Sequence, residues 1–398
     1  MNPLRIAVIG AGAYESSRSR AYQAIITKLT DLYTFCAICD RNSQARRTAA
    51  EAYHIPAQYA DVEDMLQTEK PDVVFCLTPT DSLNVMAMTV AKHRINVITE
   101  IPIGISLPIA DAITQTCREN EVKYEIAENV WLWPHEQLKQ KIVRAGLLGQ
   151  IRHVRLWYAS GCYHGFNAIR MILGAEPTRV LGYTAEVPTR PYTGYGDEAM
   201  TTRWWESGII EFPDGITCLY EMPPPGARSN HWDIEGTDGY LSGDQLVLYG
   251  GNDRSRYQIQ EVYTEIDGER VLSEVRVDTS PPIIWSNPFA KYKVSGADDI
   301  AKASILQSMY RAVTEGIEPA YGAANARRDL ELWVAIRESA YRGNVWVDLP
   351  LREMTELEGR IHEAYTRKYG ADPVSGIDAL KDAPFDRASV IWTVAGWL

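Results

Sequence analysis

Two glycines near the start of the chain have the type and spacing of a phosphate-binding turn. Gly10 and Gly12 directly follow the apolar run of residues 5–9. The first glycine permits a tight turn, and the second lets main chain approach a pyrophosphate at the N-terminus of the next helix. Glu15 stands where the usual pattern has a third glycine, so the motif needs support from later residues.

A carboxylate supplies part of that support. Asp40 ends the second apolar run, residues 33–39, where a carboxylate can accept a hydrogen bond from a ribose hydroxyl. We therefore predict NAD as the cofactor. Arg41, beside it, has the charge to accept the 2′-phosphate of NADP, which is the less favoured alternative.

These residues require a parallel sheet to hold them. Apolar runs at 5–9, 33–39, 72–77 and 96–99 each end in polar residues and alternate with helical stretches at 19–29, 43–53, 81–93 and 108–120. From residue 151 the pattern changes to strands at 151–158, 207–212, 217–222, 232–235, 240–242, 245–249 and 255–264, with a short helix at 167–173. We predict an α/β Rossmann domain followed by an α+β domain with an open, mainly antiparallel sheet.

The predicted boundaries divide the chain into three parts. Residues 1–128 form the NAD(P)-binding domain, residues 129–345 the substrate-binding and oligomerisation domain, and residues 346–398 a C-terminal helix and tail. The segment 390–398 holds two tryptophans and several aliphatic residues, so we expect it to pack on the body of the protein or on a neighbouring subunit.

The composition of the chain disfavours several classes of binding partner. The net charge of −12 and the lack of a Lys/Arg run disfavour nucleic acid and anionic membranes, and no apolar stretch is long enough to span a bilayer. Cys36 and Cys39 lie within a predicted strand and are expected to be buried rather than a redox pair, so we expect a reduced, cytoplasmic protein. His and Cys do not cluster at metal-ligand spacing. Eleven Trp and 22 Tyr suit the faces and hydroxyls of sugar rings.

The order of motifs resembles the glucose–fructose oxidoreductase, inositol dehydrogenase and rhizopine-catabolism protein family (Gfo/Idh/MocA) over residues 1–345. The matching segments are RIAVIGAGA, CDRN, YADVEDMLQTEKPDVVFCLTPT, NVITEIPIGIS, AEN, AGLLGQIRHVR, YHGFNAIRMILG and IEGTDGYL. The resemblance implies a homodimer or homotetramer. It also implies that the cofactor is bound by Gly10, Gly12, Asp40, Thr78, Pro79, Glu100 and Asn129. We further expect cofactor contacts from their sequence neighbours Ala13, Tyr14 and Arg41.

Departures from this family are expected at its catalytic positions. Ile101 replaces the lysine of the usual Glu-Lys-Pro, and Ser160 replaces the aspartate of Asp-x-x-x-His, which leaves His164. His164 is expected just before the 167–173 helix as the proton-transferring group, with Tyr163 and Tyr158 beside it. Asn167 occupies the later acidic position and is expected to bind substrate.

The remaining substrate candidates are aromatic and basic. Trp131 and Trp133 stand at alternate positions, so in extended backbone they would face one side and could stack on a sugar. Core packing is the equal alternative. A second group on predicted sheet segments suits an anionic sugar, although solvated surface arginine is the simpler explanation. This group comprises Arg203, Trp205, Arg228 and Trp232.

Three functions follow. The first is an oxidoreductase that moves hydride between a carbohydrate ring carbinol and nicotinamide, with His164 in place of the absent lysine. The second is a redox-neutral NAD-dependent glycosidase that works by oxidation, elimination, hydration and reduction, as the resemblance allows. The third is a non-catalytic NAD-binding protein. We predict the first and keep the other two as alternatives.

Overall fold

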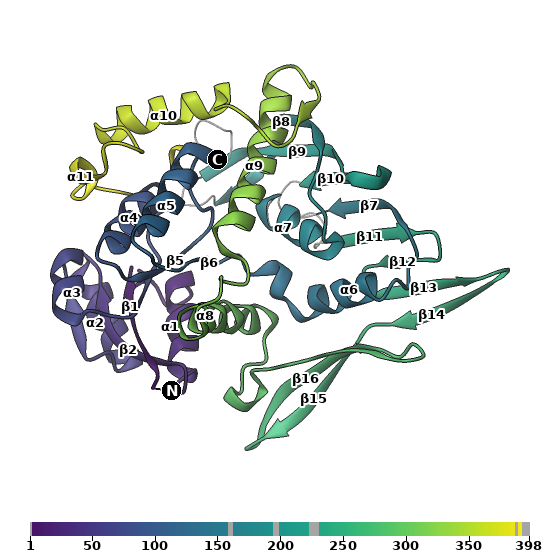
Figure 1. Ribbon diagram of the computed structural model, residues 1–398, viewed down its shortest axis with the longest axis horizontal. Coiled ribbons are helices and arrows are strands. Elements are labelled where there is room, and N and C mark those ends of the chain that lie inside the picture. The colour runs from purple at the N-terminus through teal and green to yellow at the C-terminus, as the bar shows by residue number, and fades with distance from the viewer. Residues whose placement is uncertain (1, 158–161, 194–198, 223–230, 387–388, 392–398) are drawn as a thin grey trace. The chain divides into compact units, whose positions relative to one another are not determined.

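The computed structural model describes residues 2–157, 162–193, 199–222, 231–386 and 389–391 (Figure 1). The chain forms two compact units, and each is discontinuous in sequence. Unit 1 comprises Met1–Glu128, Ala301–Arg327 and His362–Val390; unit 2 comprises Asn129–Ile300, Arg328–Ile361 and Ile391–Leu398. We refer to His362–Val390 as the C-terminal arm.

Unit 1 contains a six-stranded parallel sheet of order β3-β2-β1-β4-β5-β6. Its strands are β1 (Leu4–Ile9), β2 (Tyr33–Cys39), β3 (Ala57–Tyr59), β4 (Val73–Cys76), β5 (Asn96–Thr99) and β6 (Tyr124–Ile126). The helices between them are α1 (Arg18–Lys28), α2 (Ser43–Tyr53), α3 (Val62–Glu69), α4 (Leu83–Lys92) and α5 (Leu107–Glu119). Helices on both faces bury the central strands, which explains their continuous apolar runs. This confirms the predicted Rossmann fold.

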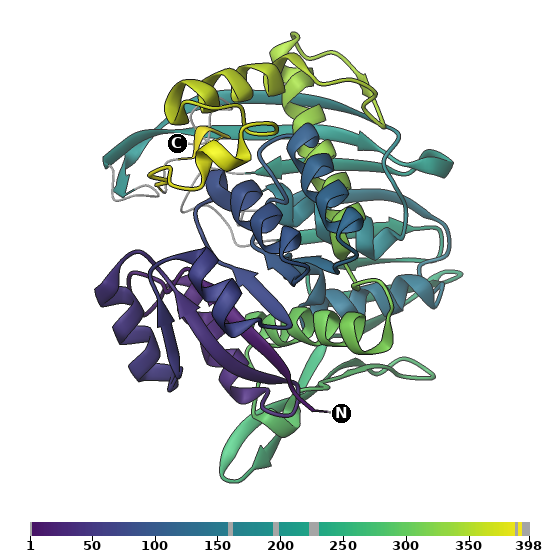
Figure 2. The same cartoon turned by 60° about the vertical axis from the view of Figure 1, so that its left-hand side comes forward.

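Later segments complete unit 1. The segment Ala301–Arg327 holds most of α8 (Ala297–Glu315) and the first turn of α9 (Gly322–Tyr341). Tyr33 donates from its hydroxyl to Leu306 O of α8 at 2.8 Å. Buried Glu125 accepts hydrogen bonds from Ser308 Oγ and from Gly322 N, the latter at 2.7 Å. The C-terminal arm contains the second half of α10 (Glu356–Tyr369) and the short α11 (Ile377–Leu380) (Figure 2).

Unit 2 is built on a nine-stranded sheet of order β14-β13-β12-β11-β7-β10-β9-β8-β18. Its strands are β7 (Ile151–Trp157), β8 (Arg179–Thr193), β9 (Ala199–Glu211), β10 (Thr217–Met222), β11 (His231–Gly236), β12 (Gly239–Ser242), β13 (Gln245–Gly250), β14 (Asp253–Gln258) and β18 (Val347–Asp348). All neighbours are antiparallel except β7 and β10. A three-stranded antiparallel sheet joins β15 (Gln260–Ile266), β16 (Glu269–Val277) and β17 (Ile283–Ser286).

Helices cover one face of the large sheet. These are α6 (Pro134–Arg144), α7 (Cys162–Leu173) and the unit 2 part of α9. Phe166 of α7 packs on Tyr220 of β10, with ring centroids 4.6 Å apart. Gly182 of β8 allows α9 to approach, because a Cβ there would lie 1.9 Å from Ile336 O. Side chains alternate along each strand, so the other face carries the more exposed residues.

Several predicted elements differ from the structure. The run 255–264 is two strands in two sheets, β14 and β15, and β9 begins at Ala199 rather than at residue 207. Strands β8, β16 and β17 were not predicted. The 15-residue β8 was missed because prolines and half-exposed residues obscure its alternation. In the described residues, no helix combines the length and apolarity needed to cross a membrane.

Candidate active site

The glycine turn after β1 is packed too closely for side chains. Gly10 has φ of +101°, and a Cβ there would lie 2.2 Å from Leu77 O at the end of β4. Gly12 has φ of +81°, and a Cβ there would lie 2.3 Å from Ser17 Oγ. Ser17 is the N-cap of α1. The turn therefore presents main chain at a helix N-terminus, which is a site suited to a pyrophosphate.

Asp40 lies against this turn. Its Oδ2 accepts a hydrogen bond from Ala11 N at 2.7 Å, and its Oδ1 accepts one from Asn42 N at 2.7 Å. Gln23 supports the same turn by donating from Nε2 to Ala11 O at 3.1 Å. Each carboxylate oxygen has two acceptor positions, so the carboxylate retains capacity for ribose hydroxyls.

The basic side chains near Asp40 donate to main-chain carbonyls. Arg20 Nη2 donates to Ala45 O at 2.9 Å, and Arg46 donates to Asp40 O. Arg41, the side chain predicted for a 2′-phosphate, instead donates to carbonyls of the C-terminal arm: Nη1 to Ala383 O at 3.0 Å and Nη2 to Lys381 O at 2.8 Å. The structure therefore gives these three guanidiniums partners within the protein.

The ends of β4 and β5 carry the next cofactor candidates. Ser82 Oγ lies 2.8 Å from Thr78 Oγ1 and 2.7 Å from Pro79 O, which fixes the loop after β4. Glu100 accepts from Arg18 Nε at 3.1 Å, so the first residue of α1 holds the carboxylate that follows β5. Ala13 and Tyr14 are exposed next to the glycine turn.

This donor set fits a dinucleotide. The glycine turn and the N-terminus of α1 would hold the pyrophosphate, and Asp40 would hold a ribose. Thr78, Pro79 and Glu100 follow neighbouring parallel strands, β4 and β5, at the carboxyl edge of the sheet, where open α/β folds bind ligands. All of these residues belong to unit 1.

The catalytic candidates lie on α7 in unit 2. Tyr163 and His164 belong to the first turn of this helix, which begins at Cys162, so the expectation that His164 precedes the helix was wrong. Tyr163 is buried and His164 is half-buried. Tyr158 lies outside the described residues. The Gly/Tyr-rich stretch favoured a loop on propensity, whereas in the structure α7 packs on the sheet through Phe166.

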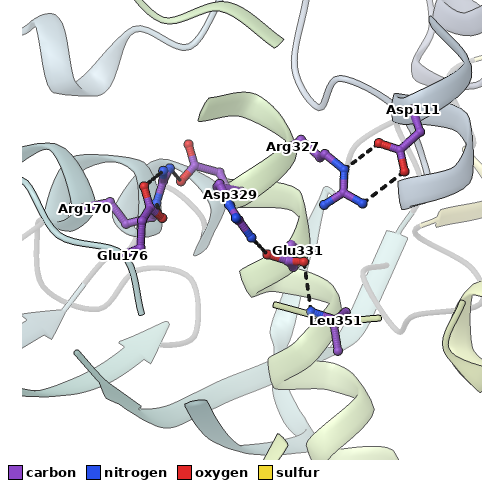
Figure 3. Close-up of polar contacts among 8 residues, drawn as sticks. Asp111, Arg170, Glu176, Arg327, Asp329, Glu331 and Leu351 are labelled. Carbon is purple, nitrogen blue, oxygen red and sulfur yellow. Dashed lines mark hydrogen bonds and ion pairs between the residues drawn. The ribbon is translucent and has the colours of Figure 1, made fainter. Parts of the chain in front are cut away.

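Asn167, one turn further along α7, hydrogen-bonds to an ionic network formed by Arg170, Asp329 and Glu176; Figure 3 shows these three ionic residues. Its Nδ2 donates to Asp329 Oδ2 at 3.0 Å, and Arg170 Nη1 donates to Asp329 Oδ1 at 2.5 Å. Arg170 also makes two hydrogen bonds to Glu176, at 2.6 and 2.8 Å. Burial opposes the charge of Arg170, yet Asp329 and Glu176 raise the pKa of its guanidinium above the usual value. Asn167 Oδ1 is buried and has no hydrogen-bond partner.

The aromatic pair after Asn129 is not extended. Residues 130–132 form a 3₁₀ turn, so the expectation that Trp131 and Trp133 alternate on one side of a strand was wrong. Trp131 is buried, and its carbonyl accepts from Gln137 Nε2 at 2.7 Å and from Gln140 Nε2 at 2.9 Å. The amides of α6 thus stabilise the turn. Asn129 itself donates to Asp298.

The expected arginine–tryptophan group is divided between the two faces of the large sheet. Trp232 of β11 is buried on the helix-covered face, with Lys139 Nζ 5.7 Å from its ring centroid. On β9, Glu206 pairs with Arg337 of α9 at 2.6 Å, so Arg203 and Trp205, an odd number of positions away, lie on the opposite face. Arg228 lies outside the described residues. The structure therefore does not bring Trp232 onto the same face of the sheet as Arg203 and Trp205.

Cysteines do not contribute reactive groups among the described residues. Burial raises the pKa of Cys36 to about 11 and that of Cys39 to about 12, which keeps both as thiols at neutral pH. Within the same ranges of the chain, no group of three or more His, Cys, Asp or Glu is arranged to hold a metal ion.

Sequence reasoning missed residues whose partners lie far away in the chain. Asp329 follows Asn167 by 162 positions, and Asp81 binds Val390 from 309 positions away. Arg18 had a local signal, because it opens the helix after the glycine turn, but its pairing with Glu100 spans 82 positions. Such pairs leave no spacing pattern.

The parallel sheet and the donor set at its carboxyl edge define a Rossmann domain suited to a dinucleotide. Residues 4–128 match the model of the Gfo/Idh/MocA oxidoreductase family, described as an NAD-binding Rossmann fold. The match confirms the resemblance, the enzyme class and the NAD cofactor expected from the sequence.

Relatives extend the comparison. The dehydrogenase aclE of Aspergillus oryzae is 24% identical over 289 residues, which cover 62% of this chain and 78% of that protein. D-apiose dehydrogenase of Paraburkholderia graminis is 27% identical over 143 residues, 36% of this chain and 37% of that protein. The solved structure of a levoglucosan dehydrogenase in complex with NADH and levoglucosan shares the fold, with a TM-score of 0.67 at 18% identity; the match covers 88% of this chain and 100% of that one.

Proposed function

We propose that this protein oxidises a hydroxyl-bearing carbon of a small carbohydrate, with NAD⁺ as hydride acceptor. The observation that carries the proposal is Asp40 against the glycine turn, a carboxylate placed for ribose hydroxyls at a helix N-terminus. The choice of a carbohydrate as substrate is supported by two of the similar proteins, a D-apiose dehydrogenase and a levoglucosan dehydrogenase.

The chain's own residues supply proton transfer and positioning. Bound NAD⁺ would accept the hydride. His164 is the expected acceptor of the hydroxyl proton, because an imidazole can take up and release a proton near neutral pH, whereas Ile101 cannot perform the role of the family's lysine. Asn167 is completely buried and donates to Asp329, so in this proposal it positions α7 rather than contacting the substrate. Tyr163, at the N-terminal end of α7, carries the phenolic hydroxyl that we propose as a hydrogen-bond donor to the substrate.

The two alternatives have less support. The relatives named above are dehydrogenases, so neither redox-neutral glycoside cleavage nor a non-catalytic role is favoured. An anionic sugar also loses its main argument, since Arg203 lies on the sheet face opposite to the helices.

We further propose that the open face of the large sheet joins copies of this chain. Residues on this face include Tyr183, Trp205 and Leu219, which are 49%, 36% and 42% exposed. Large apolar side chains on one sheet face are typical of an interface. Light scattering tests this: Leu219→Lys should lower the measured mass, whereas an unchanged mass would contradict the proposal.

Release of NADH tests the proposed reaction. The purified protein is mixed with NAD⁺ and a panel that contains D-apiose, levoglucosan and polyols, and NADH absorbance is followed. At least one sugar should give NADH, and Asp40→Ala should weaken NAD⁺ binding by about 1–3 kcal/mol. Cleavage of aryl glycosides without net NADH would instead favour the glycosidase.

A further inference from the structure

Arg41 has the chemistry to bind the 2′-phosphate of NADP, yet its guanidinium is bound to the C-terminal arm. Both Nη atoms donate to arm carbonyls, those of Lys381 and Ala383, at 2.8 and 3.0 Å. The carboxylate of Asp382 lies 3.8 Å from Nη2. A guanidinium recognises a phosphate best through two parallel N–H donors. Here each terminal nitrogen of Arg41 gives one N–H to a carbonyl of the arm, which fixes the orientation of the guanidinium.

Arg41 differs from the other arginines near Asp40 in the origin of its partners. Arg20 donates to Ala45 O and Arg46 donates to Asp40 O, so both are bound within the Rossmann domain's own β2–α2 region. The carbonyls that bind Arg41 come from about 340 residues later in the chain. The arm therefore controls this one guanidinium.

The arm is anchored on unit 1 at separate points. Asp81, which is buried, accepts hydrogen bonds from Tyr369 OH at 2.8 Å and from Val390 N at 3.0 Å. Lys381 Nζ pairs with Glu63 of α3 at 2.9 Å. Tyr369 precedes the segment 381–383, Lys381 lies within it and Val390 follows it, so these contacts hold the segment on unit 1.

We propose that the C-terminal arm is a coenzyme-specificity element: its segment 381–383 withholds Arg41 from a 2′-phosphate and places the carboxylate of Asp382 beside it. Selectivity for NAD over NADP then has two sources, Asp40 in the Rossmann domain and Asp382 in the arm. This inference rests on the proposed NAD-dependent function. Asp382 is fully exposed, so its charge can be changed with little effect on packing.

Charge reversal in the full-length protein tests the proposal. Dissociation constants for NAD⁺ and NADP⁺ are measured by calorimetric titration at low salt for wild type, Asp382→Lys and the control Asp386→Lys. The control is another exposed carboxylate of the arm that pairs with a basic residue, Lys368. Asp382→Lys should lower the ratio of the dissociation constant for NADP⁺ to that for NAD⁺ by about fivefold or more, and added salt should reduce this change. The control variant should change the same ratio by less than about twofold.

The variant Arg41→Met gives a second test, because it removes the guanidinium that the arm binds. Arg41→Met should accelerate hydrogen exchange at the amides of residues 381–390, while NADP⁺ affinity falls by less than about twofold. A tenfold or greater loss of NADP⁺ affinity in Arg41→Met, or an unchanged ratio in Asp382→Lys, would overturn the proposal. A wild-type protein that binds neither coenzyme would instead contradict the proposed function.

Discussion

Asn167 donates from Nδ2 to Asp329 Oδ2 at 3.0 Å, and both residues are completely buried. The helix that carries His164 is thereby joined to α9 through a carboxylate that also pairs with Arg170. The position at which the family has an acidic residue holds an amide here, and an amide can donate to Asp329 where a carboxylate would repel it. The departure at Asn167 thus has a structural reason.

The ion pair of Arg170 with Asp329 should determine stability far more than a neighbouring surface pair. Asp329→Ala leaves a buried guanidinium without its main partner, which should lower the free energy of unfolding by about 3–5 kcal/mol. The control is Arg327→Ala, which removes a half-exposed pair with Asp111 at 2.5 Å (Figure 3) and should cost about 0–1 kcal/mol. Urea denaturation measures both. Equal losses would show that Asp329 has no special structural role.

Replacing Asn167 by Asp should destabilise the protein although it restores the family's residue type. The new carboxylate would face Asp329 in a buried site, where two like charges cannot both ionise easily. We expect a loss of about 1–3 kcal/mol at neutral pH that becomes smaller in acid, as one carboxyl takes up a proton. Asn120→Asp is the matched control, because Asn120 donates to Thr116 O from a half-exposed helix end. A stability that does not depend on pH would contradict the account.

The sequence predicts the Rossmann half well for a physical reason. Parallel strands buried on both faces give uninterrupted apolar runs, and each run ends at the same sheet edge, so Gly10, Asp40, Thr78 and Glu100 could be placed from spacing alone. The second sheet is harder, because one face is open and its strands mix exposed and buried positions. Thus β8, with Pro188 within it, was missed.

Contacts of the site that depend on distant segments could not be predicted. Arg41 next to Asp40 suggested a phosphate ligand, since no local pattern indicates that residues 381–383 return to bind it. Trp232 and Arg203 both lie on strands of one sheet, yet the register that places them on opposite faces follows from long-range pairing.

A histidine bridge should make the stability of unit 2 depend on pH. His135 of α6 contacts Asp244 Oδ1 at 2.9 Å and Glu261 Oε1 at 3.1 Å, which connects the large sheet to β15. The hydrogen bond to Asp244 raises the pKa of His135, burial and Lys139 oppose this rise, and Glu261 adds to it. The same bond lowers the pKa of Asp244.

The signs of these shifts define the pH window. The raised pKa of His135 gives stability that is complete below about pH 6.5 and is lost as pH rises through its folded value. The lowered pKa of Asp244 gives stability that is complete above about pH 4 and is lost as pH falls through its folded value. The difference in unfolding free energy between wild type and His135→Gln should therefore be greatest between these limits and smaller at pH 9. A difference that grows toward alkaline pH would refute the bridge.

His164 should carry the proton transfer of the proposed oxidation. His164→Asn keeps a polar side chain of similar size in the first turn of α7 but cannot accept a proton, so kcat should fall by about 10²–10⁴-fold. NAD⁺ affinity should change by less than about twofold, because the proposed cofactor residues of the glycine turn and Asp40 lie in unit 1.

The control variant is His153→Asn on β7, which changes a half-buried histidine of the open sheet face and should leave kcat within about twofold. Steady-state rates of NADH formation across pH measure the effect, and the variant should lose the acidic limb of the wild-type profile. A variant with normal kcat and an unchanged pH profile would remove His164 from the mechanism and leave Tyr163 as the next candidate.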